Sequence, residues 1–130
     1  MAQIEIKPDC GNAPRKIFLA DLNAAFAKGD MSYLTDNIPD DITLEIIGIS
    51  TVHGKENVLS ELIKGPYWKL KKLTIDTIIT HGREASVNGQ IILADNSKFS
   101  FCDIYKFKGA GGPIIKEILR YIIKNKSERG

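Results

Sequence analysis

The amino-acid sequence predicts an α+β domain in which three N-terminal helices pack in a strongly curved, mostly antiparallel sheet, a cone-shaped α+β barrel. Two observations carry this prediction. Helical spacing of apolar residues prevails up to Gly65, whereas period-two alternation prevails from Trp68 onward. The links between the alternating segments are short, so neighbouring strands are expected to be antiparallel. A curved sheet around a helix leaves a cone, and its open end becomes a pocket where the helices do not fill it.

The first helix is expected to begin at Pro14, because the missing N–H of a proline does no harm in the first turn. Either Asn12 or Ala13 can cap it, and Gly29 is a natural C-terminal stop. Its apolar stripe, which must lie on the sheet, consists of Phe18, Leu22, Ala25 and Phe26.

The next segments contain two more helices and the first strand. A short helix capped by Asp30 ends before Pro39, since the residue before a proline avoids the helical region. Residues 42–47 are rich in β-branched side chains and form a strand. A third helix starts at Gly54 and stops at the Gly65-Pro66 pair. Four further strands are expected at residues 68–81, 84–93, 98–107 and 114–123.

The chain has the length and composition of one globular domain. We expect a flexible leader at residues 1–11, the domain at 12–123 and a flexible basic tail at 124–130. Hydrophobic residues make up 43% of the chain, yet no apolar run approaches the roughly 20 residues of a membrane helix. Without such a run or a signal peptide, we expect a cytoplasmic protein that does not contact membranes.

The charges and cysteines exclude several classes of partner. A formal net charge of +2 is too small to imply nucleic acid, and the basic residues near the C-terminus, Arg120 among them, are interpreted mainly as solvated faces. Cys10 and Cys102 lack the spacing of metal ligands, and neither histidine has a partner at ligand spacing. We therefore expect no nucleic acid, no metal and no cofactor.

One acid stands in a row of aromatic residues. Alternation over residues 98–107 places Asp103 on one strand face together with Phe99, Phe101, Tyr105 and Phe107. Burying an ionised carboxylate there costs several kcal/mol unless it is hydrogen-bonded or protonated. Asp103 is therefore either a structural acid with bound partners or a catalytic general acid or base with a raised pKa.

Six other side chains are candidates for contact with a ligand. Tyr105 and Tyr121 could supply phenolic donors, and His53 stands where it could reach the mouth of the cavity. The remaining candidates, which would line or close the pocket, are Phe101, Trp68 and Tyr33. For each of them, packing in the core or at its rim, or capping a helix in the case of His53, is the structural alternative.

Several short motifs resemble the nuclear-transport-factor-2-like superfamily, particularly its SnoaL-like branch, related to polyketide cyclases and ketosteroid isomerases. They are Lys28-Gly29-Asp30, the strand entry at residues 40–45, the helix start at 52–56 and the strand at 102–107. The resemblance spans about residues 12–123 and implies a cone, often dimerised through the outer sheet face. It also implies that Asp103 matches the protonated acid of ketosteroid isomerases. Ile46 and Leu22 replace the other two catalytic groups, which argues against steroid isomerisation.

The leading functional hypothesis is a dimeric domain with an apolar pocket for a small hydrophobic ligand. It could be a cofactor-independent isomerase, cyclase or dehydratase that uses Asp103 for acid–base chemistry on a hydrophobic carbonyl compound. The alternative is a noncatalytic module that carries a ligand or binds protein through its outer sheet. The sequence leaves open whether the chain is an enzyme.

Overall fold

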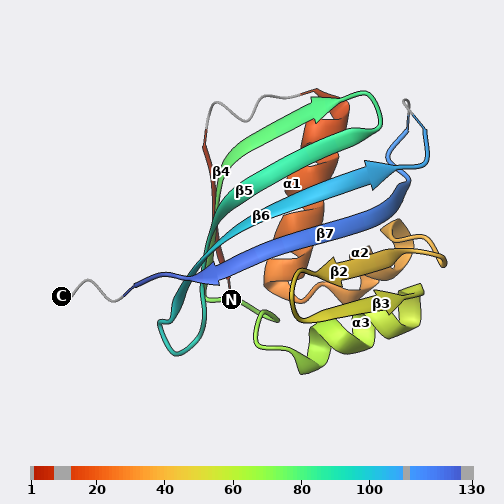
Figure 1. Ribbon diagram of the computed structural model, residues 1–130. Helices are drawn as coiled ribbons and strands as arrows, with labels where there is room; N and C mark the ends of the chain where they lie inside the picture. The colour runs from red at the N-terminus through yellow and green to blue at the C-terminus, as the bar shows by residue number, and fades with distance from the viewer. Residues whose placement is uncertain (1, 8–12, 110–111, 127–130) are drawn as a thin grey trace.

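The computed structural model describes residues 2–7, 13–109 and 112–126 and has the predicted α+β class, with three helices and a curved seven-stranded sheet (Figure 1). The elements are β1 Gln3–Ile6, α1 Pro14–Lys28, α2 Met31–Asn37, β2 Thr43–Ile46, β3 Ser50–His53, α3 Lys55–Lys64, β4 Lys72–His81, β5 Glu84–Ile92, β6 Lys98–Phe107 and β7 Ile115–Lys124. The strand order is β1-β4-β5-β6-β7-β2-β3. β1 pairs with β4 and β2 with β7 in parallel, and the remaining pairs are antiparallel.

Helix α1 lies against one face of the sheet and leaves the other face of β4 to β7 uncovered in the view of Figure 1. It begins at Pro14, as predicted, after Ala13 in extended conformation, and ends at Gly29 with φ 71°. Glycine adopts this left-handed conformation without the steric penalty of other residues. Leu22 and Ala25 of the predicted apolar stripe are buried together with Leu19, which the prediction left out. Phe18 and Phe26 are only partly buried, so the stripe is confirmed in part.

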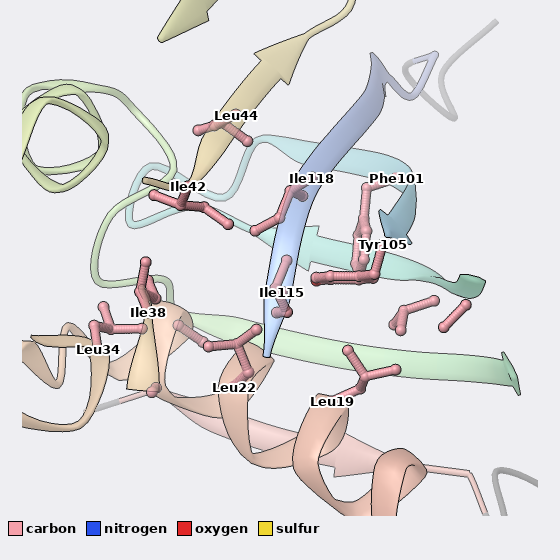
Figure 2. Close-up of a cluster of buried hydrophobic side chains, with 14 of the residues drawn as sticks. Leu19, Leu22, Leu34, Ile38, Ile42, Leu44, Phe101, Tyr105, Ile115 and Ile118 are labelled. Carbon is pink, nitrogen blue, oxygen red and sulfur yellow. The ribbon is translucent and has the colours of Figure 1, made fainter. Parts of the chain in front are cut away.

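The core lies between the helices and the inner sheet face. In Figure 2, side chains from α1 and α2 point toward side chains from β2, β6 and β7. The labelled residues are Leu19, Leu22, Leu34, Ile38, Ile42, Leu44, Phe101, Tyr105, Ile115 and Ile118. Because apolar burial supplies most of the driving force for folding, this cluster fixes how the inner faces of the strands meet the helices.

The four long strands follow the predicted meander, and β6 has the predicted bounds. The first of them starts later than predicted, at Lys72 rather than at residue 68. Lys69 has φ 57°, which interrupts an extended chain, and the N–H of Leu70 donates to the carbonyl of Ala27 in α1 at 2.8 Å. Residues 68–71 are therefore a connection anchored on the helix.

Two short strands were not predicted. Residues 3–6, expected within a flexible leader, form β1 on the edge of β4. Ser50–His53 form β3, which pairs with β2 as a hairpin, so α3 follows three strands and precedes the other four. Cys10, Asn12 and the last four residues of the predicted tail lie outside the described residues. Within the described part of the chain, no helix combines the length and apolarity needed to cross a bilayer.

Candidate functional site

The inward face of β6 carries the aromatic row with its single acid. Phe101, Tyr105 and Phe107 are buried, and Asp103 is 0% exposed. The outward residues of the same strand, such as Cys102, are only partly buried. The alternation predicted from the sequence is therefore confirmed, and Asp103 lies in the interior.

Asp103 is bound by an arginine on the neighbouring strand whose side chain is only 13% exposed. Arg120 lies directly opposite it in the β6–β7 ladder. Its Nε donates to Oδ1 of Asp103 at 2.8 Å, and its Nη2 donates to Oδ2 at 2.8 Å. Paired bonds of this kind between guanidinium and carboxylate are among the strongest hydrogen bonds in proteins. The guanidinium also lies 5.4 Å from the centre of the Phe101 ring.

The ion pair continues into a chain of hydrogen bonds that reaches α1. The hydroxyl of Tyr105 donates to Oδ2 of Asp103 at 3.1 Å. The side-chain amide of Asn23 donates to the Tyr105 oxygen at 3.0 Å and to the Leu19 carbonyl at 2.9 Å. Asn23 and Asp103 are the buried polar side chains among the described residues. The network thus connects β7, β6 and α1 through the middle of the core.

The electrostatics of the network keep its donors protonated. Burial lowers the pKa of the Arg120 guanidinium, but the charge of Asp103 and the hydrogen bonds to it outweigh that effect and leave the pKa raised. Burial, followed by the charge of Asp103, raises the pKa of Tyr105 well above its ordinary value. Since both neighbours remain donors, Asp103 has partners for both oxygens. These contacts favour its structural interpretation over a free acid in an apolar wall.

Little empty space remains beside this network. The interior cavity that Arg120 and Tyr105 border has a volume of about 20 Å³. Its other lining residues are Phe26, Leu44, Ile46, Val58, Leu62, Tyr67 and Ile118. That is room for about one water molecule, whereas pockets for organic ligands measure roughly 300 Å³ or more.

The other candidate residues lie apart from the cavity. Tyr121 is on the outer sheet face and 48% exposed. His53 is exposed on β3, where its Nδ1 lies 3.1 Å from Oγ1 of Thr43. Trp68 and Tyr33 are half-buried and pack against the core. A ligand role for these side chains stays a prediction, and the structure gathers only Phe101 and Tyr105 around Asp103.

Arg120 and Asn23 are the polar partners that the sequence analysis missed. Arg120 was grouped with solvated basic residues, yet it shares the inward face of β7 with Ile118 and Ile122. Period-two alternation along residues 114–123 gave no signal for its burial, because the opposite face, with Ile115, Leu119, Tyr121 and Ile123, is the more apolar one in the sequence. Asn23 gave no signal either, because a single amide on a helix is usually solvated.

The outer face of the sheet carries a groove that is much larger than the interior cavity beside Asp103. A groove of about 750 Å³ crosses β4 to β7. Its lining residues are Ile47, Thr77, Ile79, Ser86, Asn88, Ser100, Phe101, Cys102, Tyr121, Ile122 and Ile123. Among them, Ile79 and Ile123 are exposed large apolar side chains, and Figure 1 shows no helix over these strands.

Solved structures resemble this architecture over most of its length. An NTF2-like protein of unknown function from Cytophaga hutchinsonii is 28% identical, with a TM-score of 0.64 over 82% of this chain and 97% of that one. The chain has the nuclear-transport-factor-2-like fold. An NTF-2 like protein of unknown function from Burkholderia xenovorans is 17% identical, with a TM-score of 0.71 over 91% of this chain and 92% of that one. No family model matches the sequence, and no curated protein matches it.

An NTF2-like neighbour with a named activity is an LEH-like epoxide hydrolase from M. tuberculosis. It is 17% identical, with a TM-score of 0.62 over 77% of this chain and 75% of that one. At this identity the similarity concerns the fold. The predicted resemblance to the NTF2-like superfamily is thus confirmed, while chemistry must be argued from the residues of this chain.

Proposed function

We propose that this NTF2-like chain is a noncatalytic module that forms a homodimer through its outer sheet face. The observation that carries the proposal is the largely apolar groove on that face, beside an interior in which the acid is ion-paired and the cavity has room for about one water molecule. Apolar side chains exposed together on a soluble domain mark an interaction site. The proposal develops the noncatalytic alternative of the sequence analysis.

The chemistry of the outer face suits a second copy of the chain. Its exposed apolar side chains include Ile79, Tyr121 and Ile123. Charged residues on the same face, such as Lys106 and Glu117, lie toward the far end of β6 and β7 and pair with each other at 3.9 Å. Apolar centres with charges at the rim are typical of stable protein interfaces.

The size of the face is also adequate. β4 to β7 contain nine or ten residues each. At ordinary strand spacing and rise, four such strands cover roughly 19 Å by 33 Å, or about 600 Å². This flat area, which side chains enlarge, approaches the ~800 Å² per partner of a standard interface.

Molar mass in solution tests the dimer. We expect sedimentation equilibrium to give twice the chain mass for the natural protein and the chain mass for I123E, because a carboxylate would be buried at the interface. I63E is the matched control, since Ile63 is also exposed but lies on α3. Labelling of the Cys102 thiol in a C10S background should slow as protein concentration rises. A monomeric natural protein would refute the proposal.

The second candidate function is the leading hypothesis of the sequence analysis, a small hydrophobic ligand bound in the cone with Asp103 as acid or base. The observation that favours it is the cavity in which Arg120 and Tyr105 meet apolar side chains. Occupation by an organic ligand requires Tyr67 or Leu62 to move. If it occurs, L62A should bind a hydrophobic fluorescent probe more tightly than the natural protein, and D103N should lose turnover of any substrate found while still folding. Equal probe binding by both proteins would count against this candidate.

A further inference from the structure

The outer face of the sheet is high along one strand and low along another. The central outward side chains of β7 are large and apolar, and we call them the ridge: Leu119, Tyr121 and Ile123. The central outward side chains of β5 are smaller or polar, and we call them the floor: Ser86, Asn88 and Gln90. β6 separates the two strands (Figure 1). Residues from both sets line the outer groove, which thus has a wall of large side chains beside a floor of smaller ones.

The strand register sets each ridge residue in one row with a floor residue. In the central row, Asn88 pairs with Cys102 of β6, and Cys102 pairs with Tyr121. The rows on either side are Ser86, Ile104 and Leu119, and Gln90, Ser100 and Ile123. None of the side chains in these three rows is charged. Burying the rows against a second copy would therefore not remove a charge from water.

Two aligned arrangements of a second copy are possible, and only one fits this surface. Aligned sheets keep their strand directions within about 30° of each other, so a two-fold axis between the two faces must run nearly across the strands or nearly along them. An axis across the strands sets β7 opposite the partner's β7, and the two ridges collide. An axis along β6 sets β7 opposite the partner's β5, so each ridge lies over the floor of the other copy.

We propose that the homodimer is arranged about a two-fold axis along β6 and that Tyr121 determines this arrangement by packing over the partner's Asn88. The inference rests on the proposed homodimer and adds which residues meet in it. The row through Cys102 decides the arrangement, because the twist between packed sheets displaces the central contacts least. Tyr121 is 48% exposed in the single chain, so its ring has surface to bury. Its hydroxyl can donate to the amide oxygen of the partner's Asn88.

The second copy is the occupant because the ridge and the floor that receives it belong to the same face. They have the same row spacing, since the ladder of β5, β6 and β7 sets both. A symmetric interface uses the match twice, with Tyr121 of each copy over the partner's Asn88. A partner of another sequence would need its own ridge at this spacing and its own floor to receive Tyr121 and Ile123. The face of this chain complements itself.

Charges introduced on the two sides of the contact test the arrangement. N88E puts a carboxylate on the floor and Y121K puts an ammonium on the ridge, and both positions are exposed in the single chain, so the fold should tolerate the changes. In either homodimer the new charge meets a neutral side chain in a buried interface, and we expect the dimer dissociation constant to rise about tenfold or more. In a heterodimer of the two variants, the carboxylate meets the ammonium once and the natural contact is kept once. Its dissociation constant should be about tenfold or more below that of either homodimer.

T77K is the matched control for Y121K. Thr77 is exposed, lines the groove and lies beside Asn88 in the central row, but on β4. In the proposed arrangement β4 lies opposite the partner's β2, so T77K brings the same charge to the same face without meeting N88E. Sedimentation equilibrium of each variant and of equimolar mixtures gives the dissociation constants, and native mass spectrometry separates homodimers from heterodimers by chain mass. We expect N88E and T77K to form heterodimers only in the statistical proportion.

The outcomes separate the arrangement from the homodimer itself. Preferential pairing of N88E with Y121K supports the arrangement. If the natural protein is dimeric but N88E pairs no better with Y121K than with T77K, the axis is wrong and the homodimer stands. Preferential pairing of Y121K with Y121E would also overturn the inference, because it would show that β7 faces β7. A monomeric natural protein would refute the homodimer and this arrangement with it.

Discussion

Replacing Arg120 by methionine tests the buried ion pair most directly. The change removes the two 2.8 Å hydrogen bonds to Asp103 and keeps much of the apolar stem. Asp103 is fully buried and would retain only the Tyr105 hydroxyl as a side-chain donor. Removing one partner of such a pair costs about 3–5 kcal/mol, because the other charge remains buried. We expect the free energy of unfolding of R120M to fall by about that amount, a large share of the ~5–15 kcal/mol available to a domain.

The companion variants separate the ion pair from general damage to the core. D103N/R120M removes both charges, so the free energy of unfolding should recover part of the loss. The double-mutant cycle with D103N and R120M should then give a coupling of about 0.5–3 kcal/mol. Trp68, the single tryptophan, reports unfolding in urea by its fluorescence. A loss below about 1 kcal/mol for R120M, the range of exposed ion pairs, would show that water reaches the pair and would refute the reasoning.

Two further variants test other features of the interior. Burial and the charge of Asp103 raise the pKa of Tyr105, so the folded protein holds this proton more tightly than the unfolded chain. The corresponding stability is complete below about pH 10, the ordinary tyrosine value, and falls as pH rises above it. In urea titrations at a series of pH values, the free energy of unfolding of Y105F should therefore fall less between neutral and alkaline pH than that of the natural protein. An equal dependence of this free energy on pH in the two proteins would contradict the prediction. In G89A, the added Cβ would lie 1.9 Å from the Thr74 carbonyl oxygen, and the urea midpoint should drop by the equivalent of about 3 kcal/mol or more. In G112A nothing lies within 4 Å of the added Cβ, so its free energy of unfolding should stay within ~0.5 kcal/mol of that of the natural protein. Equal losses of stability in G89A and G112A would refute the packing argument.

Elements with strong local signals could be predicted from the sequence. Pro14 marks the start of α1 and Gly29 its end. In β6, ten residues alternate between the inward and the outward face, which defines the strand. Short elements were missed because four residues carry too little periodicity. β1 forms through backbone pairing with the edge of β4. β3 forms because the turn after β2 brings the chain back to pair with β2. Such pairings depend on the tertiary fold and leave little trace in local sequence.

The candidate site could be predicted only in part, because its contacts also depend on how the strands pair in the tertiary fold. Alternation placed Asp103 inside and offered a bound structural acid as one of two interpretations. Identifying its partner required the register between β6 and β7, which sets Arg120 opposite Asp103. The turn between these strands fixes that register, and a slip of one residue would turn Arg120 to the other face. The volume of the interior cavity depends on how side chains from five or more elements pack together. A local sequence pattern cannot predict that packing.

The parallel pairing of β2 with β7 has a consequence for biosynthesis. Thr43 lies beside Glu117, so the β2–β3 hairpin leaves the ribosome long before the strand that completes its other edge has been translated. Until β7 arrives, the nascent chain displays Leu44 and the neighbouring apolar residues without their final cover. Synthesis of β7 must therefore be complete before β2 can gain its second neighbour in the sheet.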